Sequence, residues 1–204
     1  MRKIIFIDWY ETLCFDKIWG HLQVENPLLF HQIQSLLFEN ESLNSEWLRG
    51  GIRFCNICHY LEENGIDRYT TQTEFMRGLS MQKMADDTFL PIIQKLREQG
   101  YKVYIATDHF DIFGSYMYPY MNLECYFDGY ISSAEEGCLK NDGNIDGKYR
   151  FFERFLVENQ LTPAECILID NDTMTTHIYQ SLGMQTFNPK TPKETVDVLK
   201  SLIA

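Results

Sequence analysis

The stretch IIFIDWYETL, residues 4–13, decides the fold of this chain. Four apolar residues run without a break and stop at Asp8, and Tyr10 follows two positions later. A continuous apolar run is typical of a parallel strand that is covered on both faces. We therefore expect a buried strand over residues 3–8 that carries one carboxylate at its carboxyl end.

Two further apolar strands are predicted, YKVYIATD at 101–108 and ECILIDND at 165–172. Each follows a helical pattern, and a helix over about 173–182, a short strand and a closing helix come after the last one. Strands that alternate with helices predict an α/β fold with a Rossmann-like, doubly wound parallel sheet. Such sheets bind ligands at the carboxyl ends of their strands. We expect the polar residues there to converge in one crevice: Asp8, Thr107, Asp108, Asp170, Asn171 and Asp172.

Residues 15–84 do not follow this alternation. They are rich in Leu, Phe, Gln, Glu and Met at helical spacing and contain no strand pattern. We expect an all-helical cap over residues 15–84, inserted into an α/β core that comprises residues 1–14 and 85–204.

Charge and hydropathy limit the partners of the chain. Its formal net charge of -11 over 204 residues argues against non-specific binding to nucleic acid, which needs basic patches. No apolar run approaches the roughly 20 residues of a membrane span, and the apolar run before Asp8 is too short for a signal peptide. We expect a cytoplasmic protein with a small-molecule substrate and without a nucleic-acid or membrane partner.

The segment CNICH, residues 55–59, matches the haem-attachment pattern. It lies in a helical pattern in which Cys55 and Cys58 share one face with apolar residues. A zinc site would need two more ligands at matched spacing, and the sequence has no second such pair. We interpret both cysteines as small buried hydrophobes.

Taken together, the motifs resemble those of the haloacid dehalogenase superfamily, over nearly the whole chain. The family's first motif, a strand followed by Asp-x-Asp-Gly-Thr, is similar to Asp8–Leu13 here, and its second motif corresponds to a strand that ends at Thr107. The fourth motif corresponds to ILIDND, followed by a helix and Gly183.

The resemblance implies a hydrolase in which Asp8 forms a covalent aspartyl intermediate, with a small phosphorylated substrate as the leading prediction. An attacking carboxylate splits one difficult step into two. Because attack on a phosphate brings two anions together, cations and donors must offset the charge. Thr107 is expected to bond the transferring group, and Thr12 and Asp108 to contact the substrate.

The third motif is a lysine, and two candidates fit it. Lys140 follows the family's local wording in SSAEEGCLK, but it lies 30 residues before Asp170. Lys148 lies 22 residues before Asp170 and opens the predicted helix KYRFFERFLVENQL. The segment KNDGNIDG between them is typical of an inserted hairpin turn. We predict Lys148 as the catalytic lysine, with Lys140 either a substrate contact or a solvated hairpin residue.

Tyr10 departs from the phosphatase pattern, which has a general acid and base at this position. A tyrosine with a pKa of about 10 is a poor base near neutrality. The dehalogenases that give the superfamily its name carry Tyr here, because halide leaves without a proton. Glu11 also replaces the Gly that permits a tight turn.

The fourth motif favours a metal instead. The resemblance implies a Mg²⁺ site made by Asp8, the backbone oxygen of Tyr10, Asp170 and Asn171. Asn171 stands where phosphatases have an acid, and an amide oxygen binds a hard cation more weakly. Carboxylates crowded together without a cation would repel one another and raise at least one pKa, which supports a metal. The structural alternative is that Asp172 caps the next helix and Asp170 is held by hydrogen bonds.

Two alternatives to a phosphatase follow from these departures. One is a metal-free hydrolase similar to 2-haloacid dehalogenases, which fits Tyr10 but lacks the Ser and Asn of their fourth motif. The other is a degenerate member that binds a phosphorylated ligand without turnover. Asp108 and His109 at the crevice rim could assist proton transfer, and His177 is expected to be structural.

Overall fold

The computed structural model describes residues 4–143 and 149–203. Its centre is a five-stranded, fully parallel sheet with the order β3-β2-β1-β4-β5. β1 is the middle strand, and its residues Ile4–Ile7 are all buried. The expected α/β fold is confirmed. The strands are β1 (Ile4–Ile7), β2 (Lys102–Thr107), β3 (Gly129–Ser132), β4 (Cys166–Ile169) and β5 (Gln185–Phe187).

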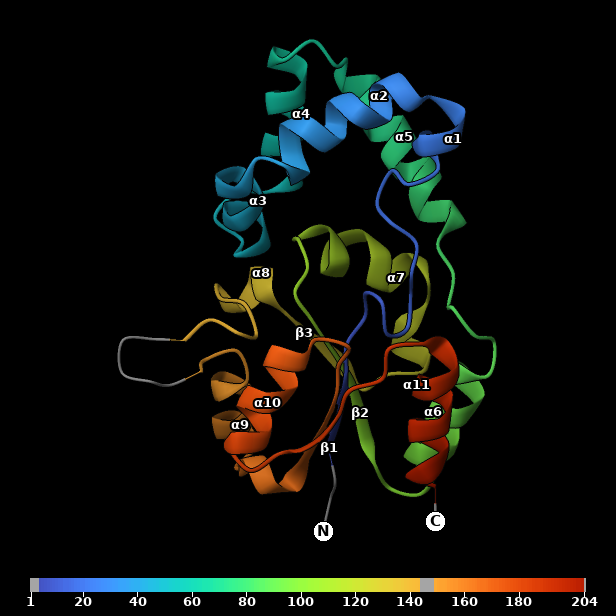
Figure 1. The fold of residues 1–204 in the computed structure, drawn as a ribbon, viewed down its shortest axis with the longest axis vertical. Helices are drawn as coiled ribbons and strands as arrows, with labels where there is room; N and C mark the ends of the chain where they lie inside the picture. Colours follow the sequence, from blue (N-terminus) through green and yellow to red (C-terminus); the bar gives the residue numbers. More distant parts are fainter. Residues whose placement is uncertain (1–3, 144–148, 204) are drawn as a thin grey trace.

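Alternate residues of β1 point to opposite faces of the sheet, as strand geometry requires. Ile5 and Ile7 pack in one apolar cluster with α6 and α11, and Ile4 and Phe6 pack in a second cluster with Phe152 and Tyr179. Helices therefore cover both faces of the sheet (Figure 1). These helices are α6 (Phe89–Glu98), α9 (Glu153–Glu158), α10 (Thr173–Ser181) and α11 (Pro192–Ser201).

The strand register brings the predicted site residues to one edge of the sheet. Ile7 lies opposite Ile105 of β2 and Ile169 of β4. Asp8 and Asp170 therefore leave adjacent strands at the same level, and the last residue of β2, Thr107, lies at the same edge. The carboxyl ends of these three strands therefore lie together at one edge of the sheet.

A layer of helices between residues 22 and 81 covers this edge of the sheet (Figure 1). We call it the helical layer. Trp47 of this layer stacks on Phe110 of the core with ring centroids 3.9 Å apart, and its Nε1 donates to Asp111 at 2.8 Å. The layer is thus packed onto the core. It comprises α1 (Leu22–Glu25), α2 (Pro27–Ile33), the π-helical segment η1 (Gln34–Phe38), α3 (Glu41–Leu48), α4 (Phe54–Glu63) and α5 (Arg68–Met81).

Three sequence-based expectations need correction. The helix predicted over residues 148–161 is shorter, because Phe151 and Phe152 are buried in a turn and α9 begins only at Glu153. The strand β3 was not predicted. Of the two helical cysteines, Cys58 is buried as expected, whereas Cys55 is exposed.

The remaining segments connect these elements. Their bounds are η2 (Phe113–Met117), α7 (Tyr118–Tyr120), η3 (Leu123–Cys125), α8 (Ser133–Glu136) and η4 (Pro163–Glu165). Among the helices of residues 4–143 and 149–203, none has the length and apolar character that crossing a bilayer demands.

Candidate active site

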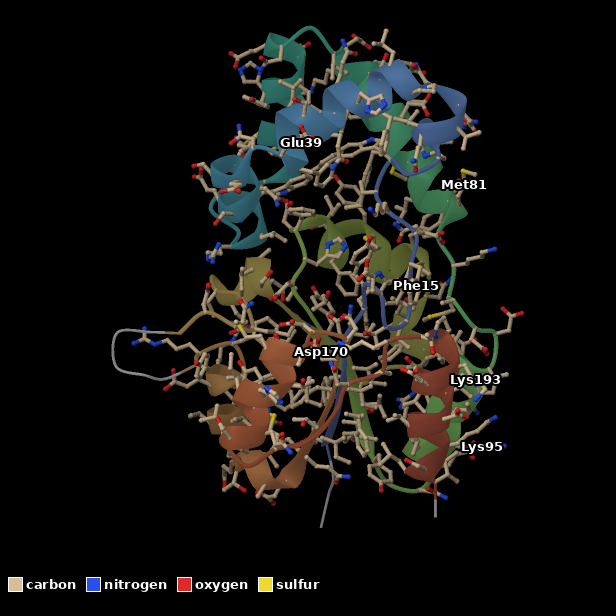
Figure 2. The ribbon with its side chains drawn as sticks, in the orientation of Figure 1. Phe15, Glu39, Met81, Lys95, Asp170 and Lys193 are labelled. Carbon is tan, nitrogen blue, oxygen red and sulfur yellow. The ribbon has the colours of Figure 1, made fainter. Side chains whose placement is uncertain are left out.

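The ammonium of Lys140 joins the two carboxylates at the centre of the sheet edge. Lys140 Nζ donates to Asp8 Oδ1 at 2.7 Å and to Asp170 Oδ2 at 2.5 Å, and it also donates to the carbonyl of Ala106 at 3.3 Å. These three bonds use all the donors of an ammonium group. Figure 2 shows Asp170 near the middle of the molecule, between the helical layer and the core helices.

Backbone bonds hold Lys140 in this place. Its N–H donates to Asp108 Oδ1 at 2.9 Å, and its carbonyl accepts from the hydroxyl of Tyr179 at 2.9 Å. Lys140 is only 4% exposed, so the alternative of a solvated hairpin residue is wrong. An isolated antiparallel bridge between Gly143 and Tyr149 closes the predicted hairpin segment. The preferred candidate, Lys148, lies outside the described residues.

Burial and neighbouring charges determine the protonation states of Lys140 and Asp8. Burial alone would lower the pKa of Lys140, but the charges of Asp170, Asp8 and Asp108 outweigh it and raise that pKa, so the lysine stays charged. Burial raises the pKa of Asp8 to about 7. Lys140 opposes this increase, and Asp170 and Asp108 add to it. Asp8 therefore exchanges its proton close to neutral pH.

Two threonines contribute hydroxyls to this edge. Thr12 Oγ1 donates to Asp8 Oδ2 at 3.3 Å. Thr107 is fully buried, and its Oγ1 has no hydrogen-bond partner within the described residues. A buried hydroxyl without a partner is costly, so Thr107 presents an unused donor at the strand end.

The turn after Asp8 is strained at Glu11. Glu11 has φ 60, the left-handed region that favours glycine, and its carboxylate accepts from Asn171 Nδ2 at 3.2 Å. Tyr10 is half-buried in the same turn, and burial, followed by the charge of Glu11, raises its pKa further above 10. Tyr10 is therefore a neutral phenol at physiological pH.

Asp172 and Asp170 have the structural roles considered from the sequence. Asp172 caps α10, since its carboxylate accepts from the N–H groups of Met174 at 3.2 Å and Thr175 at 2.9 Å. Its own N–H donates to Asp170 Oδ1 at 2.8 Å. Both oxygens of Asp170 are thus hydrogen-bonded, one to the backbone and one to Lys140.

A cavity of about 290 Å³ lies between this sheet edge and the helical layer. The core lines it with Trp9 and Tyr10, the two residues directly after Asp8, and with Asp108 and His109. The layer contributes residues of α2, η1 and α3, so the cavity lies where core and layer meet. The lining residues from the layer are Phe30, Gln34, Phe38, Asn44 and Leu48.

Solved structures share this architecture over nearly the whole chain. A HAD-like family hydrolase from Porphyromonas gingivalis superposes with a TM-score of 0.74 at 16% identity, covering 99% of this chain and 98% of that one. A HAD family enzyme from Bacteroides thetaiotaomicron, in complex with magnesium and inorganic phosphate, gives 0.67 at 18% identity over 94% and 95%.

The chain has the fold of the haloacid dehalogenase superfamily. L-2-haloacid dehalogenase from Xanthobacter autotrophicus, with chloropropionic acid covalently bound, also shares it, with a TM-score of 0.63 at 14% identity over 100% and 85%. No protein-family model and no curated protein matches the sequence.

On this haloacid dehalogenase fold, the residues predicted to hold Mg²⁺ suit a hard cation in part. Asp8 and Asp170 offer carboxylates, Asn171 an amide oxygen and Tyr10 a backbone oxygen. Asp8, Asp170 and Asp108 together bring three carboxylates to the one ammonium of Lys140. A divalent cation would offset the excess negative charge. However, no three His, Cys, Asp or Glu side chains of the described residues come together as metal ligands. The fit thus rests on two carboxylates and neutral oxygens.

His109 contributes more than its sequence indicated. It is 8% exposed, and its ring lies against Phe110 and Phe113. Burial lowers its pKa to about 4, opposed in part by the backbone of Phe110. His109 is therefore neutral at physiological pH. His177, expected to be structural, is exposed on α10.

Proposed function

We propose that this chain is a hydrolase of the haloacid dehalogenase superfamily that forms a covalent ester at Asp8, with a small phosphate monoester as substrate. The contact of Lys140 with both Asp8 and Asp170 is the observation that carries the proposal. A buried ammonium beside a buried carboxylate offsets the charge that collects when a second anion approaches. Thr12, Thr107 and Asp170 supply the other hydrogen-bonding groups of the proposed site.

Each residue has one task in this mechanism. The Asp8 carboxylate attacks phosphorus, and Thr12 and Lys140 orient it through the bonds described above. Thr107 donates its unused hydroxyl to an oxygen of the transferring phosphoryl group. Asp170 keeps the ammonium in place, since it accepts from Lys140 and from the backbone of Asp172.

Mg²⁺ is proposed as the cofactor, held by Asp8, Asp170, Asn171 and the backbone oxygen of Tyr10. It would supply positive charge to the phosphate oxygens. The similar enzyme from Bacteroides thetaiotaomicron is in complex with magnesium and inorganic phosphate, which supports this choice. With an amide in place of an acid at position 171, we expect weak binding of the cation.

The helical layer is proposed to be a substrate-selecting cap that spans residues 15–84. Its side chains form one wall of the cavity beside Asp8. Because these side chains belong to an inserted segment, they can be substituted without altering the residues at the sheet edge. We therefore assign attack to the core and substrate choice to the cap.

A metal-free dehalogenase is the second candidate, and Tyr10 favours it. A halide leaves carbon without a proton, so this reaction needs no general acid at position 10. The Xanthobacter neighbour carries a haloacid covalently bound. In this reaction the Asp8 ester would form to carbon, and Lys140 would be the cation of the site.

One assay separates these functions. The protein and its Asp8→Asn variant are incubated with phosphate monoesters and with 2-haloacids, each with Mg²⁺ and with EDTA. The proposal predicts phosphate release that requires both Mg²⁺ and Asp8. Halide release in EDTA would establish the dehalogenase instead. Binding of phosphate or beryllofluoride without turnover of any compound would identify a degenerate member.

A further inference from the structure

The cavity beside Asp8 has the lining of a site for an aromatic group. Phe30 and Phe38 of the helical layer face Phe110, Trp9 and Tyr10 of the core. The ring centroids of Phe38 and Phe110 lie 6.1 Å apart. Since Trp9 and Tyr10 directly follow Asp8, the group that leaves phosphorus when Asp8 attacks would occupy this cavity.

Two of the lining residues each carry a polar atom without a hydrogen-bond partner within the described residues. These atoms are Nδ1 of His109 and Oδ1 of Asn44, and both atoms are buried. Because His109 is neutral, its ring offers one donor and one acceptor, and Asn44 Oδ1 is an acceptor. Buried polar groups are normally paired, so these two indicate a ligand that carries at least one hydroxyl or amide group.

The charges around the cavity disfavour a second anionic group on the substrate. Asp16 and Asp108 line it with one lysine, Lys17. Acidic groups thus outnumber basic ones. A second phosphate or a carboxylate on the ring would be repelled here, so the ring carries no such substituent.

Tyr10 limits the bond that can break. With no carboxyl group at this position, a leaving oxygen receives no proton from a strong acid as it departs. An alkoxide is a poor leaving group under these conditions. A phenolate leaves as a stable anion because its conjugate acid has a pKa of about 10.

We propose that the substrates are phosphate monoesters of small, uncharged phenols, whose ring occupies this cavity and whose ring substituents bond to His109 and Asn44. This inference rests on the proposed phosphatase function. Asp8 forms a bond to phosphorus, and the bond between phosphorus and the aryl oxygen breaks, with its electron pair leaving on that oxygen. Water then attacks phosphorus and releases Asp8. The two protons of the water end on the phenol oxygen and on the phosphate.

The test compares three esters in Mg²⁺ buffer: 4-hydroxyphenyl phosphate, 4-hydroxybenzyl phosphate and glucose 6-phosphate. The first two share a hydroxyl-bearing ring but differ in the acidity of the leaving oxygen. We expect kcat/KM to be at least about a hundredfold higher for the aryl ester than for the benzyl ester. His109→Phe and Asn44→Leu should raise KM for the aryl ester about tenfold with little change in kcat. His109→Gln, which keeps a donor and an acceptor, should restore most of the affinity.

A control and a binding measurement make the outcome unambiguous. His59→Phe, on the exposed face of α4, should change nothing. Saturation-transfer NMR should show hydroquinone bound to the parent protein and to Asp8→Asn, and much more weakly to His109→Phe. Equal turnover of all three esters, or an unchanged KM in both cavity variants, would overturn the inference and leave the phosphatase intact. If no ester releases phosphate, the phosphatase function and this inference fall together.

Discussion

Arg49, the residue that follows α3, forms a bidentate ion pair with Asp142, two residues after Lys140. Its Nε and Nη2 donate to the two carboxylate oxygens at 2.8 and 2.7 Å. The same carboxylate accepts from the N–H of Leu139 at 2.8 Å. The helical layer is therefore joined directly to the segment that carries the lysine of the candidate site.

Loss of this ion pair should affect catalysis more than folding. In Arg49→Gln we expect the free energy of unfolding to fall by only about 1 kcal/mol, because the pair is partly exposed. We expect kcat to fall about tenfold, since the segment around Lys140 loses its contact with the layer. Urea unfolding and steady-state kinetics measure the two effects. Lys193→Gln, which removes an exposed pair with Asp197, is the matched control, and equal behaviour of both variants would refute this link.

The two lysine candidates can be separated by substitution. Lys140→Gln leaves Asp8 and Asp170 buried without a cation, which should cost about 3–5 kcal/mol of stability and abolish turnover. Lys148→Gln should retain activity within about twofold, because Lys140 already supplies the ammonium at Asp8. Lys95, whose exposed side chain points away from Asp170, provides the control Lys95→Gln (Figure 2). Loss of activity in Lys148→Gln alone would return the role to Lys148.

The raised pKa of Asp8 predicts a rise in activity with pH. Asp8 attacks as a carboxylate, so kcat/KM should increase through an apparent pKa of about 7. Mg²⁺ should move this limb to lower pH, because a cation favours the charged form. Stability should show the opposite trend. A carboxyl group whose pKa is raised on folding stabilises the protein below its unfolded pKa of 3.8, and this contribution is lost as pH rises to about 7.

The measurement is a pH profile of kcat/KM at several Mg²⁺ concentrations. Asp197→Asn, on the exposed α11, should leave the profile unchanged. If kcat/KM rose near pH 4 at every Mg²⁺ concentration, Asp8 would be neither buried nor close to the cation.

Glycine at position 11 should stabilise the chain. Glu11 has φ 60, and an L residue in this region costs about 1–2 kcal/mol. After the entropic cost of glycine, Glu11→Gly should gain about 0.5–1 kcal/mol in the free energy of unfolding. Gln160→Gly, at φ 55 and remote from the site, should gain a similar amount. Only Glu11→Gly should also change Mg²⁺ affinity, because Glu11 contacts Asn171. A loss of stability in both variants would contradict the strain argument.

Strand ends were predictable from the sequence because local patterns determine them. The uninterrupted run before Asp8 and those before Thr107 and Asp170 identify buried parallel strands, and parallel strands place their ends together. The capping role of Asp172 was also foreseen, because an Asp before a helical pattern is a common N-cap.

Long-range contacts were not predictable in this way. Lys140 reaches Asp8 across 132 residues of chain, and the spacing to Asp170 pointed to Lys148 instead. An inserted hairpin alters spacing without altering the position of the residue before it. The environment of His109 was equally hidden, since its ring packs against Phe110 and Phe113 only once the chain is folded.

Trapping of the covalent intermediate shows whether Asp8 is the nucleophile. The protein is mixed with 4-hydroxyphenyl phosphate and Mg²⁺, quenched in acid within one turnover, digested and analysed by mass spectrometry. We expect one phosphoryl group on the peptide that contains Asp8, and no such peptide from Asp8→Asn. Release of phosphate with the Asp8 peptide unmodified, or a phosphoryl group on another residue, would contradict this role of Asp8.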